Sequence, residues 1–164
     1  MLGRLTSYFS GTEEPVVLVF WGDHLPYLGD NQLAYAELGM ELSQREDDRE
    51  NPLASYETPY VIWVNDSAAE TLDWESAVAA LDLPENGTIS SSFLGAAVLE
   101  LTGRKEESPW FSFLNDLRRE LPVVQKKTYM KMDGSYTKLI SSSQLEEIRN
   151  CLLYTSSRNF SSLQ

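Results

Sequence analysis

Two side chains that can bind a metal ion, Asp23 and His24, stand next to each other directly after Gly22. A carboxylate and an imidazole suit a divalent ion such as Mn²⁺ or Zn²⁺. Gly22 leaves room for the backbone to turn, so that both side chains can reach one ion. An aspartate beside a histidine is more often a hydrogen-bonded structural pair, and His24 is the only histidine in the chain. The pair therefore predicts half of a metal site, whose other ligands must come from elsewhere.

A strand is expected to position this pair. Residues 16–21 form an unbroken apolar and aromatic run that is too short for a buried helix. Such a run is typical of a strand covered on both faces in a parallel sheet. Pro26 prevents the strand from continuing as a central one. Because ligands of open α/β sheets bind beyond the carboxyl ends of the strands, Asp23 and His24 stand where chemistry is expected.

Further elements follow from the same kind of pattern. A second buried strand is expected at 58–65. Either Asp66 caps a helix directly after it, or Asp73 caps a helix over 74–81. A final hairpin is expected around Asp133-Gly134, with a last helix from Gln144. The spacing of apolar and capping residues predicts helices at the following places: 2–9, 33–42 interrupted by Gly39, 93–101, and 110–121 opened by Ser108-Pro109. These alternations of strand and helix indicate an α/β fold.

Composition excludes several classes of protein. The 164 residues carry a formal net charge of −12, which argues against a nucleic-acid partner. One cysteine, Cys151, rules out a disulfide framework within the chain and a Cys-based zinc finger. The sequence shows neither a signal peptide nor a run of roughly 20 apolar residues that could span a membrane.

Six segments carry a resemblance to a known family: VVLVFWGDHLPYLGDN at 16–31, YAELG at 35–39, YETPYVIWVN at 56–65, ISSSFLGAAVLELTG at 89–103, SPWF at 108–111 and LRRELP at 117–122. In this order they resemble the C-terminal part of the lipoteichoic acid synthase family. That family belongs to the sulfatase branch of the alkaline phosphatase superfamily. The resemblance covers about Leu5 to Asn150, nearly the whole chain.

The resemblance implies a fold, a site and a reaction. The fold is the C-terminal part of a mainly parallel α/β sheet flanked by helices, with a small antiparallel hairpin subdomain. The family transfers phosphoglycerol from a phospholipid through a threonine nucleophile bound to Mn²⁺ in an extracytoplasmic domain of a bacterial membrane protein. Asp23 and His24 correspond to the ion's Asp-His ligands, for Mn²⁺ or another divalent cation such as Zn²⁺ or Mg²⁺.

The resemblance also implies that this chain is a fragment. The threonine nucleophile, the other ligands and the membrane-associated segment of the parent are expected upstream of Met1, so the isolated chain is expected to be inactive. The expected partner of the parent is a phospholipid or a polyglycerolphosphate, with no nucleic acid. A sulfatase, a phosphoethanolamine transferase, or a non-catalytic binding module with a degenerate metal site remain alternatives.

Three regions are expected along the chain. Residues 1–121 are the C-terminal portion of the catalytic domain, and 122–150 form the hairpin and helix subdomain. Residues 151–164 are a non-native or disordered tail, because Cys151 to Ser156 reads as a translated transposon-end sequencing adapter and the rest has no periodicity.

Overall fold

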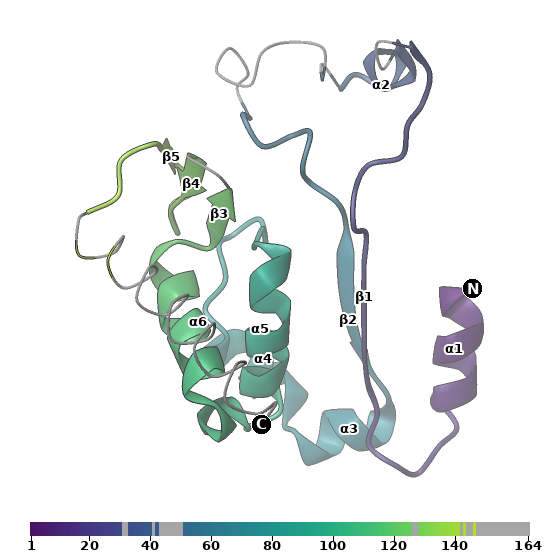
Figure 1. Cartoon of the computed structure of the whole chain (residues 1–164). Coiled ribbons are helices and arrows are strands. Elements are labelled where there is room, and N and C mark those ends of the chain that lie inside the picture. The colour runs from purple at the N-terminus through teal and green to yellow at the C-terminus, as the bar shows by residue number, and fades with distance from the viewer. Residues whose placement is uncertain are drawn as a thin grey trace, which may run out of the picture. The chain divides into compact units, whose positions relative to one another are not determined.

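A computed structural model of the whole chain describes residues 1–30, 33–40, 42, 51–125, 128–141, 143 and 146. It divides the chain into two compact units, Met1–Trp74 and Glu75–Gln164 (Figure 1). The tail at 151–164 lies outside the described residues, as does the helix expected from Gln144 except for residue 146. The division into residues 1–121, 122–150 and 151–164 stays a prediction.

The first unit is built on a two-stranded sheet. Its elements in chain order are α1 (Leu2–Phe9), β1 (Val17–Trp21), α2 (Leu33–Glu37), β2 (Tyr60–Val64) and α3 (Asp66–Thr71). In Figure 1, β1 and β2 form a long ribbon, with α2 beyond one end and α3 at the other. The helix expected over 33–42 is shorter than predicted, because α2 ends at Glu37. Gly39 takes a φ of +78° that favours glycine and is typical of the end of a helix.

The two strands run antiparallel, which corrects the expected parallel arrangement. Val17 pairs with Val64 at one end of the ladder, and Trp21 pairs with Tyr60 at the other. The long connection after β1 brings the chain back beside the end from which it left. An apolar run carries no information about strand direction, so the sequence pattern could not decide between the two arrangements.

The expected burial of this sheet is also wrong. No residue of β1 or β2 is buried, and Trp21 is 50% exposed. Continuous apolar strands are typical of sheets covered on both faces, whereas the described chain supplies only two strands to this sheet. The mixed helix and strand class is nevertheless confirmed, with small antiparallel sheets.

The second unit packs two helices beside a small sheet. Helix α4 (Trp74–Ala80) begins at the boundary between the units. The helical elements that follow are the 3₁₀ turn η3 (Ser91–Phe93), α5 (Leu94–Leu101), the 3₁₀ turn η4 (Lys105–Glu107) and α6 (Pro109–Glu120). The strands are β3 (Val123–Gln125), β4 (Thr128–Met130) and β5 (Tyr136–Thr137). Helix α6 starts with proline at its first turn, as predicted, because the missing N–H has no helical partner there.

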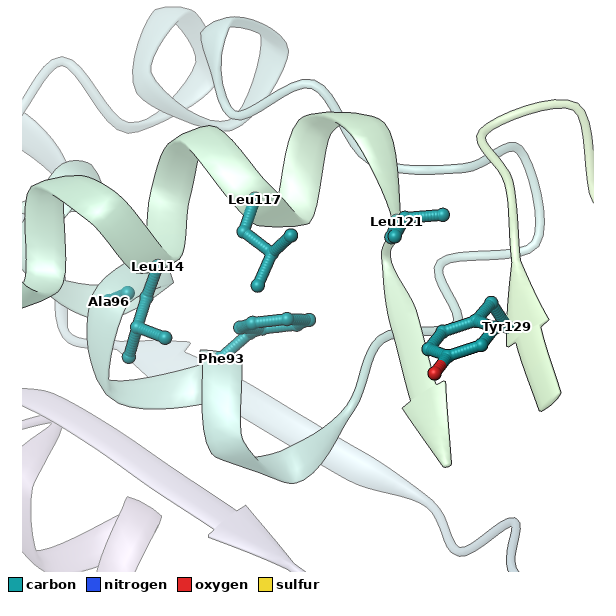
Figure 2. Packing of buried hydrophobic residues seen from close by; sticks show 6 residues of the cluster. All are labelled: Phe93, Ala96, Leu114, Leu117, Leu121 and Tyr129. Atoms are coloured by element: carbon teal, nitrogen blue, oxygen red, sulfur yellow. The ribbon is translucent and has the colours of Figure 1, made fainter. Parts of the chain in front are cut away.

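The core of the second unit forms between these helices and the sheet. Figure 2 shows a cluster of buried residues in this core: Phe93, Ala96, Leu114, Leu117, Leu121 and Tyr129. The predicted apolar face of α6 is confirmed, since Leu114 and Leu117 are buried and Trp110 stacks on Phe113. Burying such side chains removes apolar surface from water and stabilises the unit.

A polar network lies beside this core. Arg118 is fully buried, and its guanidinium donates to the Glu100 carboxylate at 2.8 Å and to the Asp82 carbonyl at 2.9 Å. Its Nε donates to the side-chain oxygen of Asn115, whose amide in turn donates to the Ala96 carbonyl. The network connects α5 and α6 and satisfies the buried charge, as a buried guanidinium requires.

The predicted turn at Asp133-Gly134 is confirmed between β4 and β5. Gly134 has a φ of +79°, and its N–H donates to the Lys131 carbonyl. The residues before the turn supply two strands, β3 and β4, which pair antiparallel. The sheet is therefore three-stranded.

In the part of the chain that the structure describes, no helix combines the length and the apolar character needed to cross a membrane.

Candidate functional site

The chain leaves the β1–β2 ladder at Gly22. The N–H of Gly22 donates to the Pro59 carbonyl at 3.1 Å, and the Gly22 carbonyl accepts the hydroxyl of Thr58 at 2.6 Å. A Cβ on residue 22 would lie 2.9 Å from the Cβ of Thr58, closer than real Cβ contacts. Glycine is therefore required at position 22 because a neighbouring side chain approaches its backbone closely.

Asp23 and His24 follow directly and are held by local hydrogen bonds. Asp23 Oδ1 accepts the N–H of His24 at 3.0 Å, which fixes the carboxylate over its own loop. His24 Nδ1 lies 3.0 Å from the Leu25 carbonyl oxygen. A carbonyl only accepts, so Nδ1 carries the hydrogen and, in the neutral ring, Nε2 keeps its lone pair.

The remaining atoms of the pair converge. His24 Nε2 lies 3.5 Å from Asp23 Oδ2, and the two side chains are 75% and 84% exposed. Ligand atoms about 2.1 Å from one ion, at an angle of roughly 90–110°, lie about 3.0–3.4 Å apart. The observed separation thus fits two ligands of one divalent ion after a small adjustment. The contact from Nδ1–H to a carbonyl is also the arrangement that orients metal-binding histidines.

The pair supplies two donors and needs more to make a metal centre. Among residues 1–30, 33–40, 42, 51–125, 128–141, 143 and 146, no group of three or more His, Cys, Asp or Glu side chains is arranged to hold an ion. The role of Asp23 and His24 as ligands stays a prediction.

The loop after His24 is anchored again at Pro26. The hydroxyl of Tyr35, a buried residue of α2, donates to the Pro26 carbonyl at 2.6 Å. The exposed Tyr27 donates its hydroxyl to Asp30 at 2.8 Å, and this bond to the carboxylate raises the pKa of Tyr27. The loop that carries Asp23 and His24 is therefore held at its start by the two residues that precede β2, and further along by α2.

Two residues that the sequence analysis does not single out hold the two ends of the β1–β2 ladder, and Thr58 is the one at the site. The sequence pattern gives Thr58 no role, yet its hydroxyl donates to the Gly22 carbonyl. The sequence pattern predicts Asn65 only as the end of a strand, yet Asn65 is 2% exposed and caps α3 by accepting the N–H of Ala68. Asp66 is therefore not the cap of α3 but its first residue. Asp73 directly precedes α4, and its role as the cap of that helix stays a prediction. The sequence signal for the Thr58 contact is Pro59. A proline within a predicted strand lacks the backbone N–H that the ladder needs, so another group must supply the donor.

The comparisons with known proteins bear on the half of the chain that carries these residues. The family model for Sulfatase matches residues 1–104, more than half of the chain and all of the first unit. Neither the curated proteins nor the solved structures include a significant match. The match includes Gly22, Asp23, His24 and Thr58. On this basis the chain belongs to the sulfatase family.

Proposed function

We propose that this chain is the C-terminal, ligand-bearing portion of a metal-dependent phosphoglycerol transferase of the lipoteichoic acid synthase type. The parent acts on a phospholipid head group or a polyglycerolphosphate in the bacterial cell envelope. It is anchored in the plasma membrane and carries its catalytic domain outside the cytoplasm. Membership of the sulfatase family and the ordered motifs at 16–31 and 56–65 support this proposal. The observation that carries it is the convergence of Asp23 Oδ2 and His24 Nε2.

The chain's own residues have defined tasks in this proposal. Asp23 contributes a carboxylate and its negative charge, and His24 contributes the Nε2 lone pair. The Leu25 carbonyl keeps the proton on Nδ1 and so holds the ring in the ligating tautomer. The site would take Mn²⁺, with Zn²⁺ or Mg²⁺ as other candidates. When bound, the ion supplies Lewis-acid chemistry that activates a hydroxyl nucleophile and offsets charge on the phosphoryl group.

A manganese titration followed by NMR tests the ligand assignment. Because the chain has one histidine, its imidazole signals belong to His24 alone. Substoichiometric Mn²⁺ is expected to broaden the signals of Asp23 and His24 before those of other residues. Asp23→Asn should abolish this selectivity. Asp30→Asn is the matched control, because Asp30 lies in the same loop and bonds to Tyr27 instead. Uniform broadening over the acidic surface would contradict the proposal.

The nucleophile of the proposed reaction belongs to the parent and lies outside these 164 residues. The isolated chain should therefore show no transfer or phosphodiesterase turnover with phosphatidylglycerol vesicles and Mn²⁺. Turnover that is lost on Asp23→Ala would contradict the assignment of the nucleophile to another segment.

The family match supports a second reaction, sulfate-ester hydrolysis, on the same pair of ligands. Phosphoethanolamine transfer uses the same scaffold as well. The nucleophile discriminates between these reactions: a Cys or Ser in a sulfatase signature favours hydrolysis, whereas a Thr after several membrane spans favours transfer. Sequencing the gene upstream of the codon for Met1 tests this. If the manganese titration shows no selective broadening at Asp23 and His24, the result favours the remaining alternative, a non-catalytic binding module.

A further inference from the structure

We propose that Thr58 is a positioning residue that aims the Asp23–His24 pair through the backbone of Gly22. The inference rests on the proposed function, because it concerns the same metal ligands. It begins from the hydrogen-bond pattern of the β1–β2 ladder. In an antiparallel ladder, directly opposed residues alternate between pairs that exchange two backbone hydrogen bonds and pairs that exchange none.

Gly22 and Pro59 are opposed one step beyond the Trp21–Tyr60 pair. The bond from the N–H of Gly22 to the Pro59 carbonyl marks this position as one that should exchange two bonds. The reciprocal bond needs an N–H on residue 59, which proline lacks. The hydroxyl of Thr58 supplies the missing donor, 2.6 Å from the Gly22 carbonyl oxygen.

The hydrogen bond from the Thr58 hydroxyl fixes the orientation of the peptide unit that leads into the site. The Gly22 carbonyl belongs to the same planar peptide unit as the N–H of Asp23, so holding one orients the other. Without the Thr58 hydroxyl, Gly22 has wide conformational freedom, because glycine has no Cβ to restrict it. The next contacts, from Asp23 Oδ1 to the His24 N–H and from His24 Nδ1 to Leu25, are all local to the loop. Thr58 is thus the contact that ties the direction of the pair to the sheet.

Three variants separate positioning from stability. Thr58→Val removes the hydroxyl and keeps the branched shape, whereas Thr58→Ser keeps the hydroxyl. Thr71→Val is the matched control, because the Thr71 hydroxyl donates to the Ser67 carbonyl at 2.7 Å in α3, away from the loop. Urea unfolding of each variant measures the effect on stability alone.

The readouts are Mn²⁺ affinity from His24 broadening and the residual dipolar couplings of the Asp23 and His24 N–H bonds without metal. Thr58→Val is expected to weaken Mn²⁺ binding about tenfold, the size typical for residues that orient metal ligands. It should also change both couplings. Thr58→Ser and Thr71→Val should match the wild type. Thr58→Val/Pro59→Ala restores a backbone donor opposite Gly22 and should regain most of the affinity.

Wild-type couplings and affinity in Thr58→Val would overturn the inference, as would an equal loss in Thr58→Ser. The couplings are measured without metal, so the two proposals fail separately. If the wild type binds no Mn²⁺ at His24 but Thr58→Val changes the couplings, the metal proposal fails and the positioning role of Thr58 stands.

Discussion

The side-chain oxygen of Asn65 accepts the backbone N–H of Val16 at 2.9 Å, while the N–H of Asn65 donates to the Val16 carbonyl. The backbone carbonyl of Asn65 is engaged by Ala69 in α3, so the side chain takes its place in the ladder. The Asn65 amide nitrogen also donates to backbone carbonyls before β1, including that of Glu14 at 2.8 Å. One buried amide thus joins the end of β2 to the start of β1.

Asn65→Ala should lower the free energy of unfolding of the first unit by about 2–4 kcal/mol. A lost N-cap costs about 1 kcal/mol, and each buried backbone group left without a partner costs about 1–3 kcal/mol. Asn65→Asp keeps the cap oxygen but places a carboxylate against the Glu14 carbonyl, so it should not restore stability. Urea unfolding measures both variants, with the exposed Asn86→Ala as control. Wild-type stability in Asn65→Asp would show that the donor side of the amide contributes little.

Gly22→Ala should destabilise the first unit and displace the metal-ligand pair. The added methyl would meet the Cβ of Thr58 at 2.9 Å, and that atom cannot rotate away because it is fixed to the backbone. Overpacking of this kind costs about 1–3 kcal/mol. Gly11→Ala is the control, because nothing lies within 4 Å of its added Cβ and its φ is not positive. Urea unfolding and the His24 imidazole signals provide the measurements; equal behaviour of the two variants would count against the close approach.

Arg118→Met should lower the free energy of unfolding of the second unit by about 3–5 kcal/mol, because it leaves the largely buried Glu100 carboxylate without its buried partner. Burial lowers the pKa of Arg118, and the Glu100 charge opposes that shift. The exposed pair of Arg104 and Glu107 offers the control, since Arg104→Met should have only a small fraction of this effect. Circular dichroism during urea unfolding measures both. A small loss for Arg118→Met would mean that Arg119, the other cation on Glu100, compensates.

The pair of Arg104 and Glu107 should give the second unit a pH-dependent contribution. Hydrogen bonds from the Arg104 guanidinium, at 2.7 and 2.8 Å, lower the pKa of Glu107. A carboxyl whose pKa is lowered on folding stabilises the fold above its unfolded pKa, and that stabilisation is lost as the pH falls through the folded value. Carbon-13 NMR titration of the Glu107 carboxyl, in the wild type and in Arg104→Gln, measures the shift. A pKa unchanged by Arg104→Gln would contradict the assigned cause.

Local signals predicted much of the secondary structure. Ser108-Pro109 marked the start of α6, and Asp133-Gly134 marked the turn between β4 and β5. The apolar runs located β1 and β2 to within a few residues. These features are set by neighbouring residues, through proline and glycine geometry and through side-chain periodicity, and so they can be read from short stretches.

The arrangement of the strands could not be read in this way. The direction of β2 relative to β1 depends on contacts such as that between Asn65 and Val16, which are 49 residues apart. At the site, the adjacency of Asp23 and His24 was visible in the sequence. The hydroxyl that orients Gly22 comes from Thr58, 36 residues away. Pro59 signals that a backbone donor is missing, but it does not show which group replaces that donor.

The side-chain hydrogen bonds at the two ends of the β1–β2 ladder, from Asn65 and from Thr58, together fix how the strands align. A slip of β1 by two residues would keep every side chain on its own face of the sheet, and so apolar contacts alone oppose it weakly. Such a slip would separate Asn65 from Val16 and Thr58 from Gly22 at once. The two contacts therefore allow one alignment of β1 with β2, and this alignment fixes the position of the carboxylate and the imidazole along the sheet.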